Sequence, residues 1–396
     1  MNIPNFVHPL LEMVRPEARG APESGIVEVM NYGRGRPGLI PLWAGEGDLP
    51  TPDFISAAAA RALEAGETFY TWQRGIPELR QALADYHARV YGRPFASDRF
   101  FVTGSGMQAI QTAVRMVAGG GDEVIVPSPG WPNSSAALGV GGAQAIDLPM
   151  SFSPDGWRLD LDRLFEICGP KTRAIFLNSP STPSGWTASR EELTAILAFA
   201  RSKGLWIIAD EVYGRFCFEG DRAPSFHDVA DPEDAILYVN TFSKNWAMTG
   251  WRIGWLEAPP VLGQVVENLV QYSTSGVAAF MQRAAVTALE EGEDFVEYQV
   301  ERARRGRAIL CDTLAATGRV RFAPPAGAFY LFFAIDGAPD VARLGLRLVD
   351  EANVGLAPGT ACGAAGAGFM RAGFAAGEPT LTEAAGRLAE WLERTR

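Results

Sequence analysis

Lysine is almost missing from this chain of 396 residues, which carries 35 lysine and arginine residues together. Only Lys171, Lys203 and Lys244 are lysines, so arginine supplies nearly all of the positive charge. A lysine amine can lose its proton and react as a nucleophile, whereas the guanidinium group of arginine stays protonated. A lysine that lies in a binding site of this protein is therefore a candidate for chemistry that requires a primary amine.

Histidine and cysteine are also scarce. The three histidines, His8, His87 and His227, lie far apart in the sequence, so we expect no histidine-based site and predict no metal. The four cysteines are scattered and form no CxxC pair, which is typical of reduced thiols. This use of cysteine favours a cytoplasmic protein.

Long apolar runs and an excess of positive charge are lacking as well. No stretch approaches the roughly 18 uninterrupted apolar residues that a membrane span requires. The N-terminus has no basic start followed by an apolar run, so we expect no secretory signal. The formal net charge of −11 argues against nucleic acid or a membrane surface as a partner, although a local pocket for a small anion stays compatible with it.

The middle of the chain alternates short strand-like runs with helical patterns, for example at 107–118 and 189–204. Ser189 is placed to cap the second helix, with Glu192 as its capping-box partner. The alternation predicts an α/β fold, a mostly parallel seven-stranded sheet with helices on both faces. The predicted strands are 99–104, 122–128, 143–148, 173–178, 205–210, 235–240 and 251–257.

The two ends of the chain have a different pattern from the middle. Residues 1–50 are rich in proline and glycine, whereas 291–396 contain a long helix candidate, strands around GAFYLFFAI and a final amphipathic helix. We predict a large α/β domain over 51–290 and a small α+β domain that combines 1–50 with 291–396.

The predicted sheet separates the three lysines. In an open parallel sheet, ligands bind outside the carboxyl ends of the strands. Lys171 and Lys203 precede strands, so they lie at the opposite edge and are expected to be solvated surface residues. Lys244 follows the strand 235–240 and lies at the ligand-binding edge.

Other unusual residues fall at the same edge. Gly104, Ser105 and Gly106 precede a helix, where their backbone N–H groups would form a cradle for phosphate. Asp210 ends an apolar strand, and such a carboxylate needs a positive partner, either a structural arginine or a protonated cofactor nitrogen. The remaining side chains at this edge are Trp131, Thr182, Tyr213 and Arg252.

This set of groups matches the requirements of pyridoxal phosphate. The amine of Lys244 would form an imine with the aldehyde, and Asp210 would keep the pyridine nitrogen protonated. Trp131 would stack on the ring, while the glycine cradle and Arg252 would hold the phosphate. The need for an imine explains why a lysine is kept at position 244 in a chain that otherwise uses arginine.

The sequence resembles the class I/II aminotransferases of fold type I, especially the aspartate aminotransferase-like branch. Each matching stretch is modest alone, but their order and spacing are highly specific. They are GEGDLPTP (45–52), FYTWQRGIPELR (69–80), VTGSGMQAI (102–110), PSPGWPN (127–133), LNSPSTPSGW (177–186), ADEVY (209–213), TFSKNWAMTGWRIGW (241–255), PAGAFY (325–330), APGTAC (357–362) and FMRAGFA (369–375).

The resemblance implies a role for each matching position. Lys244 takes the place of the Schiff-base lysine, Asp210 that of the carboxylate at the pyridine nitrogen, and Tyr213 that of the phenol beside ring oxygen O3′. Arg371 matches the arginine that grips the α-carboxylate of the substrate, and Gly45 matches a backbone position that touches the same group. The other implied cofactor contacts are Ser105, Gly106, Met107, Trp131, Thr182, Thr241, Ser243 and Arg252, of which Trp131 and Thr182 also border the substrate.

The resemblance also implies a homodimer with composite sites, because Tyr70 matches a tyrosine that reaches the phosphate of the neighbouring subunit. Two departures from the family pattern bear on the substrate. The turn that usually reads Asn-Pro-Thr-Gly has Thr182 in place of the asparagine, and Met107 stands where some relatives carry a lysine. A second cationic clamp for a dicarboxylate is not evident; Arg34, Arg36 and Arg74 are candidates, each as compatible with a surface position.

The function implied is ping-pong transamination, in which an L-amino acid gives its amino group to a 2-oxo acid through pyridoxal 5′-phosphate. A C–S β-lyase or a decarboxylase on the same scaffold is the alternative, because one early intermediate is shared by all three reactions. Two readings from other classes stay open: a dinucleotide-binding protein, since GRGRPG at 33–38 matches G-x-G-x-x-G, and a non-catalytic ligand-sensing module.

Overall fold

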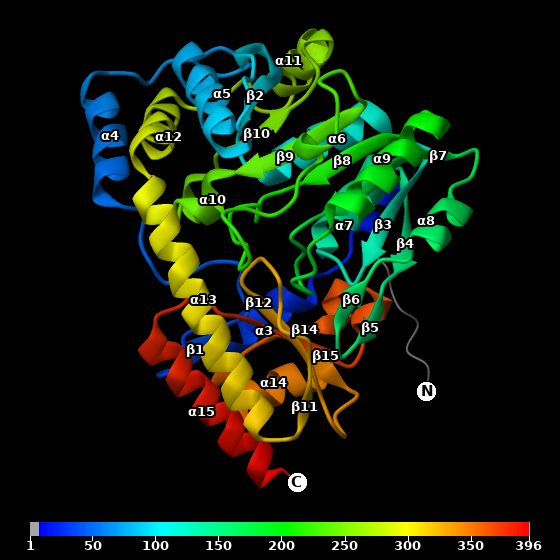
Figure 1. The fold of residues 1–396 in the computed structure, drawn as a ribbon, viewed down its shortest axis with the longest axis vertical. Helices are drawn as coiled ribbons and strands as arrows, with labels where there is room; N and C mark the ends of the chain where they lie inside the picture. The colour runs from blue at the N-terminus through cyan, green and yellow to red at the C-terminus, as the bar shows by residue number, and fades with distance from the viewer. Residues whose placement is uncertain (1–7, 396) are drawn as a thin grey trace.

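A seven-stranded sheet lies in the upper half of the molecule in Figure 1. The computed structural model of the protein describes residues 8–395, so residues 1–7 and 396 of the predicted small domain lie outside the described residues. The strands are β2 (Phe100–Thr103), β3 (Glu123–Ser128), β4 (Gln144–Pro149), β7 (Thr172–Asn178), β8 (Trp206–Asp210), β9 (Ile236–Thr241) and β10 (Gly254–Glu257). Their order across the sheet is β2-β10-β9-β8-β7-β3-β4.

The sheet is mostly parallel, as predicted. Neighbouring strands from β9 through β8, β7 and β3 to β4 pair in parallel, whereas β10 is antiparallel to both β9 and β2. Each of the seven predicted strands is present, but the start predicted for the last one, at residue 251, was wrong. Thr249–Trp251 form a 3-10 turn and Arg252 has a left-handed backbone with φ of +53°, so the strand begins at Gly254.

Helices cover both faces of this sheet. Helix α6 (Gly106–Val117) packs on one face and α9 (Arg190–Lys203) on the other. Alternate residues of each inner strand point to opposite cores, and both sets are apolar because both faces are covered. The predicted capping box is present at α9: Ser189 Oγ accepts from Glu192 N at 3.1 Å, and Glu192 Oε2 accepts from Ser189 N at 2.7 Å.

Further elements surround the sheet. Helix α12 packs against α4 and α5 at one end of it, and α7 packs beside α6. A short hairpin of β5 and β6 follows β4. The bounds are α4 (Asp53–Glu64), α5 (Pro77–Tyr91), α7 (Pro132–Gly141), α8 (Leu161–Ile167), α10 (Phe242–Asn245), α11 (Gly263–Gln271), α12 (Ala279–Glu291), β5 (Ser151–Ser153) and β6 (Gly156–Arg158).

A second, four-stranded sheet lies in the lower half of Figure 1, and the long helix α13 (Glu293–Ala316) runs from the first half to the second. The strands, in spatial order, are β11 (Val320–Arg321), β12 (Tyr330–Ile335), β15 (Phe369–Gly373) and β14 (Ala357–Pro358). Helices α14 (Val341–Glu351) and α15 (Glu378–Arg394) share an apolar core with this sheet.

The N-terminal segment joins this second part. Strand β1 (Ile40–Pro41) pairs in parallel with β13 (Val354–Gly355), and α3 (Gly25–Gly33) packs against α14. The short helices α1 (Pro9–Glu12) and α2 (Pro16–Arg19) precede α3. These pairings are consistent with the predicted division into two domains at about residues 50 and 290. The division itself stays a prediction.

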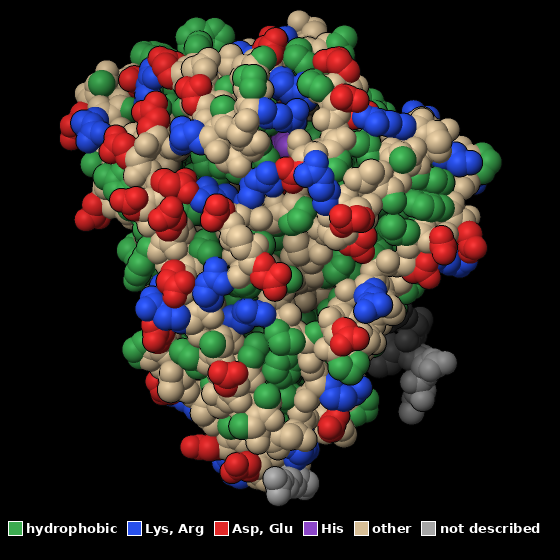
Figure 2. All heavy atoms as spheres, in the orientation of Figure 1, with side chains coloured by type: hydrophobic (Ala, Val, Ile, Leu, Met, Phe, Trp, Pro, Cys, Tyr) green, Lys and Arg blue, Asp and Glu red, His purple; other side chains and the backbone are tan. Residues whose placement is uncertain are grey.

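The surface carries no single field of charge on the face that Figure 2 draws, because positive and negative side chains are interspersed there. None of the helices in residues 8–395 combines the length and the apolar character needed to cross a membrane. The GRGRPG stretch covers the end of α3 and the turn before β1, so it does not form the strand-turn-helix of a dinucleotide-binding motif.

Candidate active site

A cavity of about 370 Å³ opens at the carboxyl edge of the large sheet. Lys244 and Asp210 both line it, together with Gly45 and Arg371 from the parts of the chain outside that sheet. The other sequence-predicted residues that line it are Gly106, Met107, Trp131, Thr182, Tyr213, Thr241, Ser243 and Arg252. Lys171 and Lys203 are exposed elsewhere, as expected for surface lysines.

Two predicted residues lie outside the lining of this cavity. Ser105 is buried directly behind the lining as the N-cap of α6, where its Oγ accepts from Gln108 N at 3.1 Å. Tyr70 lies on the surface with 93% of its side chain exposed. A role for Tyr70 at this cavity of the same chain is therefore not supported, whereas its predicted reach toward a neighbouring subunit stays a prediction.

The amine of Lys244 lies at the centre of the polar groups. Its Nζ donates to the carbonyl oxygen of Gly45 at 2.5 Å, and it lies 5.7 Å from the ring centre of Tyr213. Burial and the positive charge of Arg371 lower the pKa of Lys244 to about 8. A substantial share of this amine is therefore neutral, and nucleophilic, slightly above neutral pH.

Asp210 ends β8 and is buried. Burial raises the pKa of its carboxyl group to about 7, while the backbone N–H of Val212 and the charge of Lys244 act in the opposite direction. Within residues 8–395, no arginine or lysine forms an ion pair with this carboxylate. The structural-arginine alternative for its partner is therefore not supported, which leaves the protonated nitrogen of a bound group.

Arg371 lies in β15 of the second sheet, is buried, and lines the same cavity as Lys244 and Asp210. Its guanidinium group donates to Thr182 Oγ1 at 3.2 Å and to the carbonyl oxygen of Trp43 at 2.6 Å, and it lies over the ring of Tyr330 at 4.6 Å. The Nε of Arg371 is buried without a hydrogen-bond partner among the described residues. A planar donor set that is held on one side and open on another is suited to a carboxylate ligand.

Tyr330 is a site residue that the sequence analysis did not assign, although it ends the quoted motif PAGAFY. It lines the cavity, and its hydroxyl lies 2.7 Å from the hydroxyl of Tyr213. A Cβ on Gly45 would lie 2.5 Å from this hydroxyl, so only glycine fits at position 45 without a shift of Tyr330. The sequence did offer one indication of Tyr330, because PAGAFY occurs in order among the motifs that resemble the family.

The N-terminus of α6 meets the ends of β9 and β10. A Cβ on Gly254 would lie 2.8 Å from the backbone nitrogen of Gly106, and a Cβ on Gly106 would lie 3.3 Å from Cβ of Thr241. Thr241 Oγ1 donates to Ser243 Oγ at 2.9 Å. Glycines thus allow a helix N-terminus to approach two hydroxyl groups closely, which is the arrangement of an anion site.

The arginines considered as a second clamp do not line this cavity. Each binds a neighbour on the surface: Arg34 binds Asn31, Arg36 binds Asp350 and Arg74 binds Glu267. A role for these three arginines as the second clamp in the cavity of their own chain is therefore not supported. In the described part of the chain, the cations that line the cavity are Lys244, Arg252 and Arg371.

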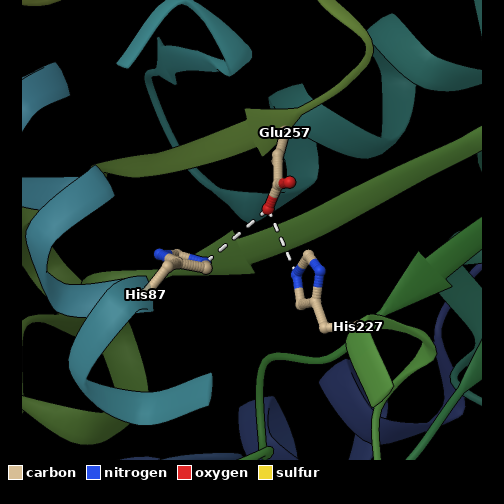
Figure 3. Close-up of side chains that lie close together, drawn as sticks. All are labelled: His87, His227 and Glu257. Atoms are coloured by element: carbon tan, nitrogen blue, oxygen red, sulfur yellow. Dashed lines mark ion pairs between the residues drawn. The ribbon is translucent and has the colours of Figure 1, made fainter. Parts of the chain in front are cut away.

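The structure also joins two histidines that the sequence separates widely. His227 Nε2 lies 3.2 Å and His87 Nε2 lies 3.8 Å from Glu257 Oε2, all three side chains being buried (Figure 3). The distance between the two histidines in the sequence therefore gave no indication that their side chains lie together in the fold. Ligand atoms at this spacing are compatible with a cation, so the surrounding groups decide between a metal site and an ion-pair network.

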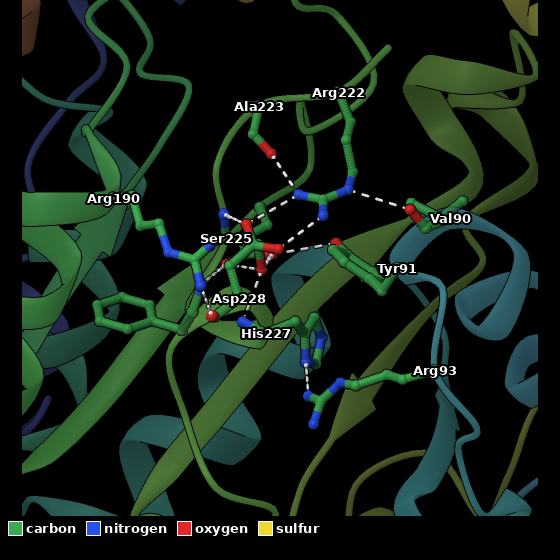
Figure 4. Close-up of polar contacts among 11 residues, drawn as sticks. Val90, Tyr91, Arg93, Arg190, Arg222, Ala223, Ser225, His227 and Asp228 are labelled. Carbon is green, nitrogen blue, oxygen red and sulfur yellow. Dashed lines mark hydrogen bonds and ion pairs between the residues drawn. The ribbon is translucent and has the colours of Figure 1, made fainter. Parts of the chain in front are cut away.

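The neighbours favour an ion-pair network. Arg93 donates to Nδ1 of His227 at 3.3 Å, as Figure 4 shows, so Nδ1 is the acceptor of this ring and Nε2 is left to donate toward the carboxylate. Arg99 donates to the other oxygen of Glu257 at 3.0 Å. Although burial opposes it, contact with His227, His87 and Arg99 lowers the pKa of Glu257 to about 2. A divalent cation would add charge beside two arginines, and we keep the prediction of no metal.

The comparisons with known proteins agree with this site. The family model for aminotransferase class I and II matches residues 38–388. An aspartate aminotransferase of Thermotoga maritima is 34% identical, covering 89% of this chain and 91% of the relative, and an arginine–pyruvate transaminase of Pseudomonas aeruginosa is 34% identical, covering 89% of each. The crystal structure of the Thermotoga maritima enzyme superposes with a TM-score of 0.89 at 33% identity, covering 96% of this chain and 100% of that one.

These matches span nearly the whole chain, and they agree with a lysine amine, an unpaired carboxylate and a buried arginine in one cavity. The fold is accordingly that of the fold type I enzymes. The chain belongs to the class I and II aminotransferases and is a transaminase that uses pyridoxal 5′-phosphate to exchange an amino group between amino acids and 2-oxo acids.

Proposed function

We propose that Lys244 is the covalent anchor of the cofactor and that Asp210, Tyr213 and Arg371 hold the reacting groups around it. The observation that carries this assignment is the pairing of a lysine whose pKa is lowered to about 8 with a buried, unpaired carboxylate in one cavity. An amine and an acid whose pKa values move toward each other are typical of a catalytic site.

The residues fit the cofactor on three counts. Asp210 has no ion-pair partner among the described residues and suits a protonated ring nitrogen. The glycines at the N-terminus of α6 leave room for a phosphate, and Arg252 lines the same cavity. When bound, pyridoxal phosphate supplies an aldehyde that condenses with amines and a ring that accepts electron density.

The protein's own groups then carry out the proton transfers. Arg371 holds the α-carboxylate of the amino acid, which places the bond from Cα to hydrogen near Lys244. Once an amino donor had displaced it, the neutral amine of Lys244 would be placed to act as the general base for the proton on Cα and to hold that proton for the return step. Asp210 would pair with the protonated ring nitrogen, and Tyr213, whose hydroxyl lies 2.7 Å from that of Tyr330, would donate to the ring oxygen.

The same site serves both halves of a ping-pong cycle: one amino acid leaves as a 2-oxo acid, and a second 2-oxo acid returns along the reverse path. The relatives named above are aminotransferases, and no feature of the cavity favours the β-lyase or decarboxylase alternative. Binding of the cofactor also opposes the dinucleotide-binding and ligand-sensing readings. A cytoplasmic location and a lack of nucleic-acid partners stay predictions.

We also propose a homodimer in which Tyr70 completes the phosphate site of its neighbour. Large aromatic side chains stand out from the surface around this residue: Phe69 is 83% exposed, Trp72 63% and Tyr272 85%. Exposed apolar side chains that gather in one region mark an interaction surface. The proposal rests on this surface together with the resemblance at Tyr70.

Covalent attachment tests the anchor directly. Borohydride reduction of the holoenzyme, followed by peptide mapping, is expected to place the pyridoxyl group on the peptide that contains Lys244. Lys244→Arg should lose the adduct and at least about 100-fold of the transamination rate, because arginine supplies no neutral amine. Lys203→Arg is the matched control and should keep both; an adduct on another lysine would refute the assignment.

The carboxylate of Asp210 generates a pH-dependent prediction for the apoenzyme. Its folded-state pKa of about 7 exceeds its ordinary value of 3.8, so its contribution to stability falls as the pH rises through that window. Asp210→Asn removes this cost. Urea unfolding measures the free energy of unfolding of both apo proteins. The difference in favour of the variant should grow by about 2 to 3 kcal/mol as the pH rises from 5 to 8.

With cofactor bound, the order should reverse, since the variant lacks a partner for the ring nitrogen and its affinity for pyridoxal phosphate falls. Asp155→Asn, in the exposed β5–β6 turn, is the control for a charge removed outside the cavity. A stability difference between Asp210→Asn and wild type that does not vary with pH would contradict the buried, unpaired carboxylate.

Arg371 is expected to act on substrate and not on cofactor. Arg371→Ala should lower kcat/KM for amino acids by about 10²- to 10⁴-fold, because two charge-assisted hydrogen bonds to the carboxylate are lost. The dissociation constant of the cofactor should stay close to that of the wild type. Arg343→Ala, on the exposed side of α14, is the control, and wild-type kcat/KM in the Arg371 variant would count against this role.

Mixed dimers test whether Tyr70 acts across the interface. A heterodimer of one Lys244→Ala subunit and one Tyr70→Phe subunit contains one intact site only if Tyr70 works in the neighbour. About half of the wild-type activity per dimer is then expected from two nearly inactive parents. The presence of heterodimers is verified by mass spectrometry. If these heterodimers have almost no transamination activity, Tyr70 acts in the site of its own subunit or in no site.

A further inference from the structure

Helix α3 gives the cavity an apolar wall. Ile26 and Met30 lie four residues apart, on one face of the helix, and both line the cavity. Both are partly buried and pack against the core that Trp43 and Val29 form. The wall is therefore fixed by packing and is not a chance exposure of apolar side chains.

The side of the cavity that the large sheet and its helices contribute is also lined by apolar side chains. Met107 and Ile110 come from α6, and Trp131 precedes α7. All three belong to one apolar core with the inner strands of the sheet. Met107 thus presents an apolar side chain to the cavity at the N-terminus of α6.

The cations of the cavity are all accounted for by the proposed chemistry. Among residues 8–395, its cations are Lys244, which holds the aldehyde, Arg252, beside the phosphate site, and Arg371, which holds the α-carboxylate. The acid near Arg252 is Glu46, whose Oε2 accepts from Thr249 Oγ1 at 2.9 Å. No cation remains among them for a second carboxylate on a substrate.

We propose that this aminotransferase acts on amino acids with uncharged, apolar side chains, aliphatic or aromatic, and not on dicarboxylic ones. The inference deepens the proposed function and rests on it. A carboxylate placed against the α3 wall would lose its hydration without gaining a partner, whereas an apolar side chain is stabilised there by burial.

The test measures the first half-reaction of the holoenzyme with single amino donors. The rate at which the cofactor's absorbance changes, as a function of donor concentration, gives kcat/KM for leucine, methionine, phenylalanine, aspartate, glutamate and lysine. We expect the best apolar donor to exceed aspartate and glutamate by about 100-fold or more, since a site rejects a group whose polar demands it leaves unmet.

A variant with a new cation sharpens the test. Met30→Arg should raise kcat/KM for glutamate by tenfold or more and lower that for leucine, because the new guanidinium group can pair with the second carboxylate. Met13→Arg, on an 81% exposed side chain outside the cavity lining, should leave the ratio of the two donors unchanged. If Met30→Arg does not fold, the donor ratio of the wild type decides alone.

The outcomes separate this inference from the function on which it rests. A wild-type preference for aspartate, glutamate or lysine would overturn the apolar specificity and leave the aminotransferase assignment in place. If no amino donor changed the absorbance of a holoenzyme that carries its cofactor, the proposed function itself would fail.

Discussion

The burial of an ionisable carboxylate without a protein cation is the constraint on which this site depends. Asp210 ends a strand whose other residues are apolar, so water does not stabilise its charge. The chain therefore carries a cost in the absence of a ligand, and a protonated ring nitrogen is the group that offsets it. The same burial acts on Lys244, whose amine is partly neutralised, so one low-dielectric environment prepares both the acid and the amine.

The sheet order explains why these groups meet. The parallel strands β8 and β9 are neighbours, so their last residues, Asp210 and Thr241, lie at the same carboxyl edge, with Lys244 shortly after β9. The second sheet approaches the same edge from the other side and supplies Arg371 on β15. Under the proposed roles, one packed core presents the groups that hold the cofactor and a second core presents the arginine that holds the carboxylate of the substrate.

Much of this arrangement follows from local sequence signals. Alternating apolar strands and helices define the large sheet, and the residues after each strand define the edge, because side-chain chemistry and position repeat there. What sequence could not supply was pairing across long distances. His87 and His227 meet through packing of α5 against the sheet, and Tyr330 reaches Tyr213 from the second sheet. Whether Arg34, Arg36 and Arg74 lined the cavity depended on their surface partners, which no local pattern records.

The replacement of the usual amide by Thr182 is understandable in the light of Tyr330. An asparagine side chain is longer and carries both an acceptor oxygen and a donor NH₂ group, whereas the shorter Thr182 accepts from Arg371 and has a single O–H left to donate. The hydroxyl of Tyr330 instead contacts that of Tyr213, and its ring lies beneath the guanidinium group of Arg371. The link between the substrate anchor and the phenol beside the cofactor is thus kept, but it passes through two hydroxyl groups and an aromatic face. Because the tyrosine is rigid and buried, this link keeps both groups fixed where a shorter side chain alone would leave one of them unsupported.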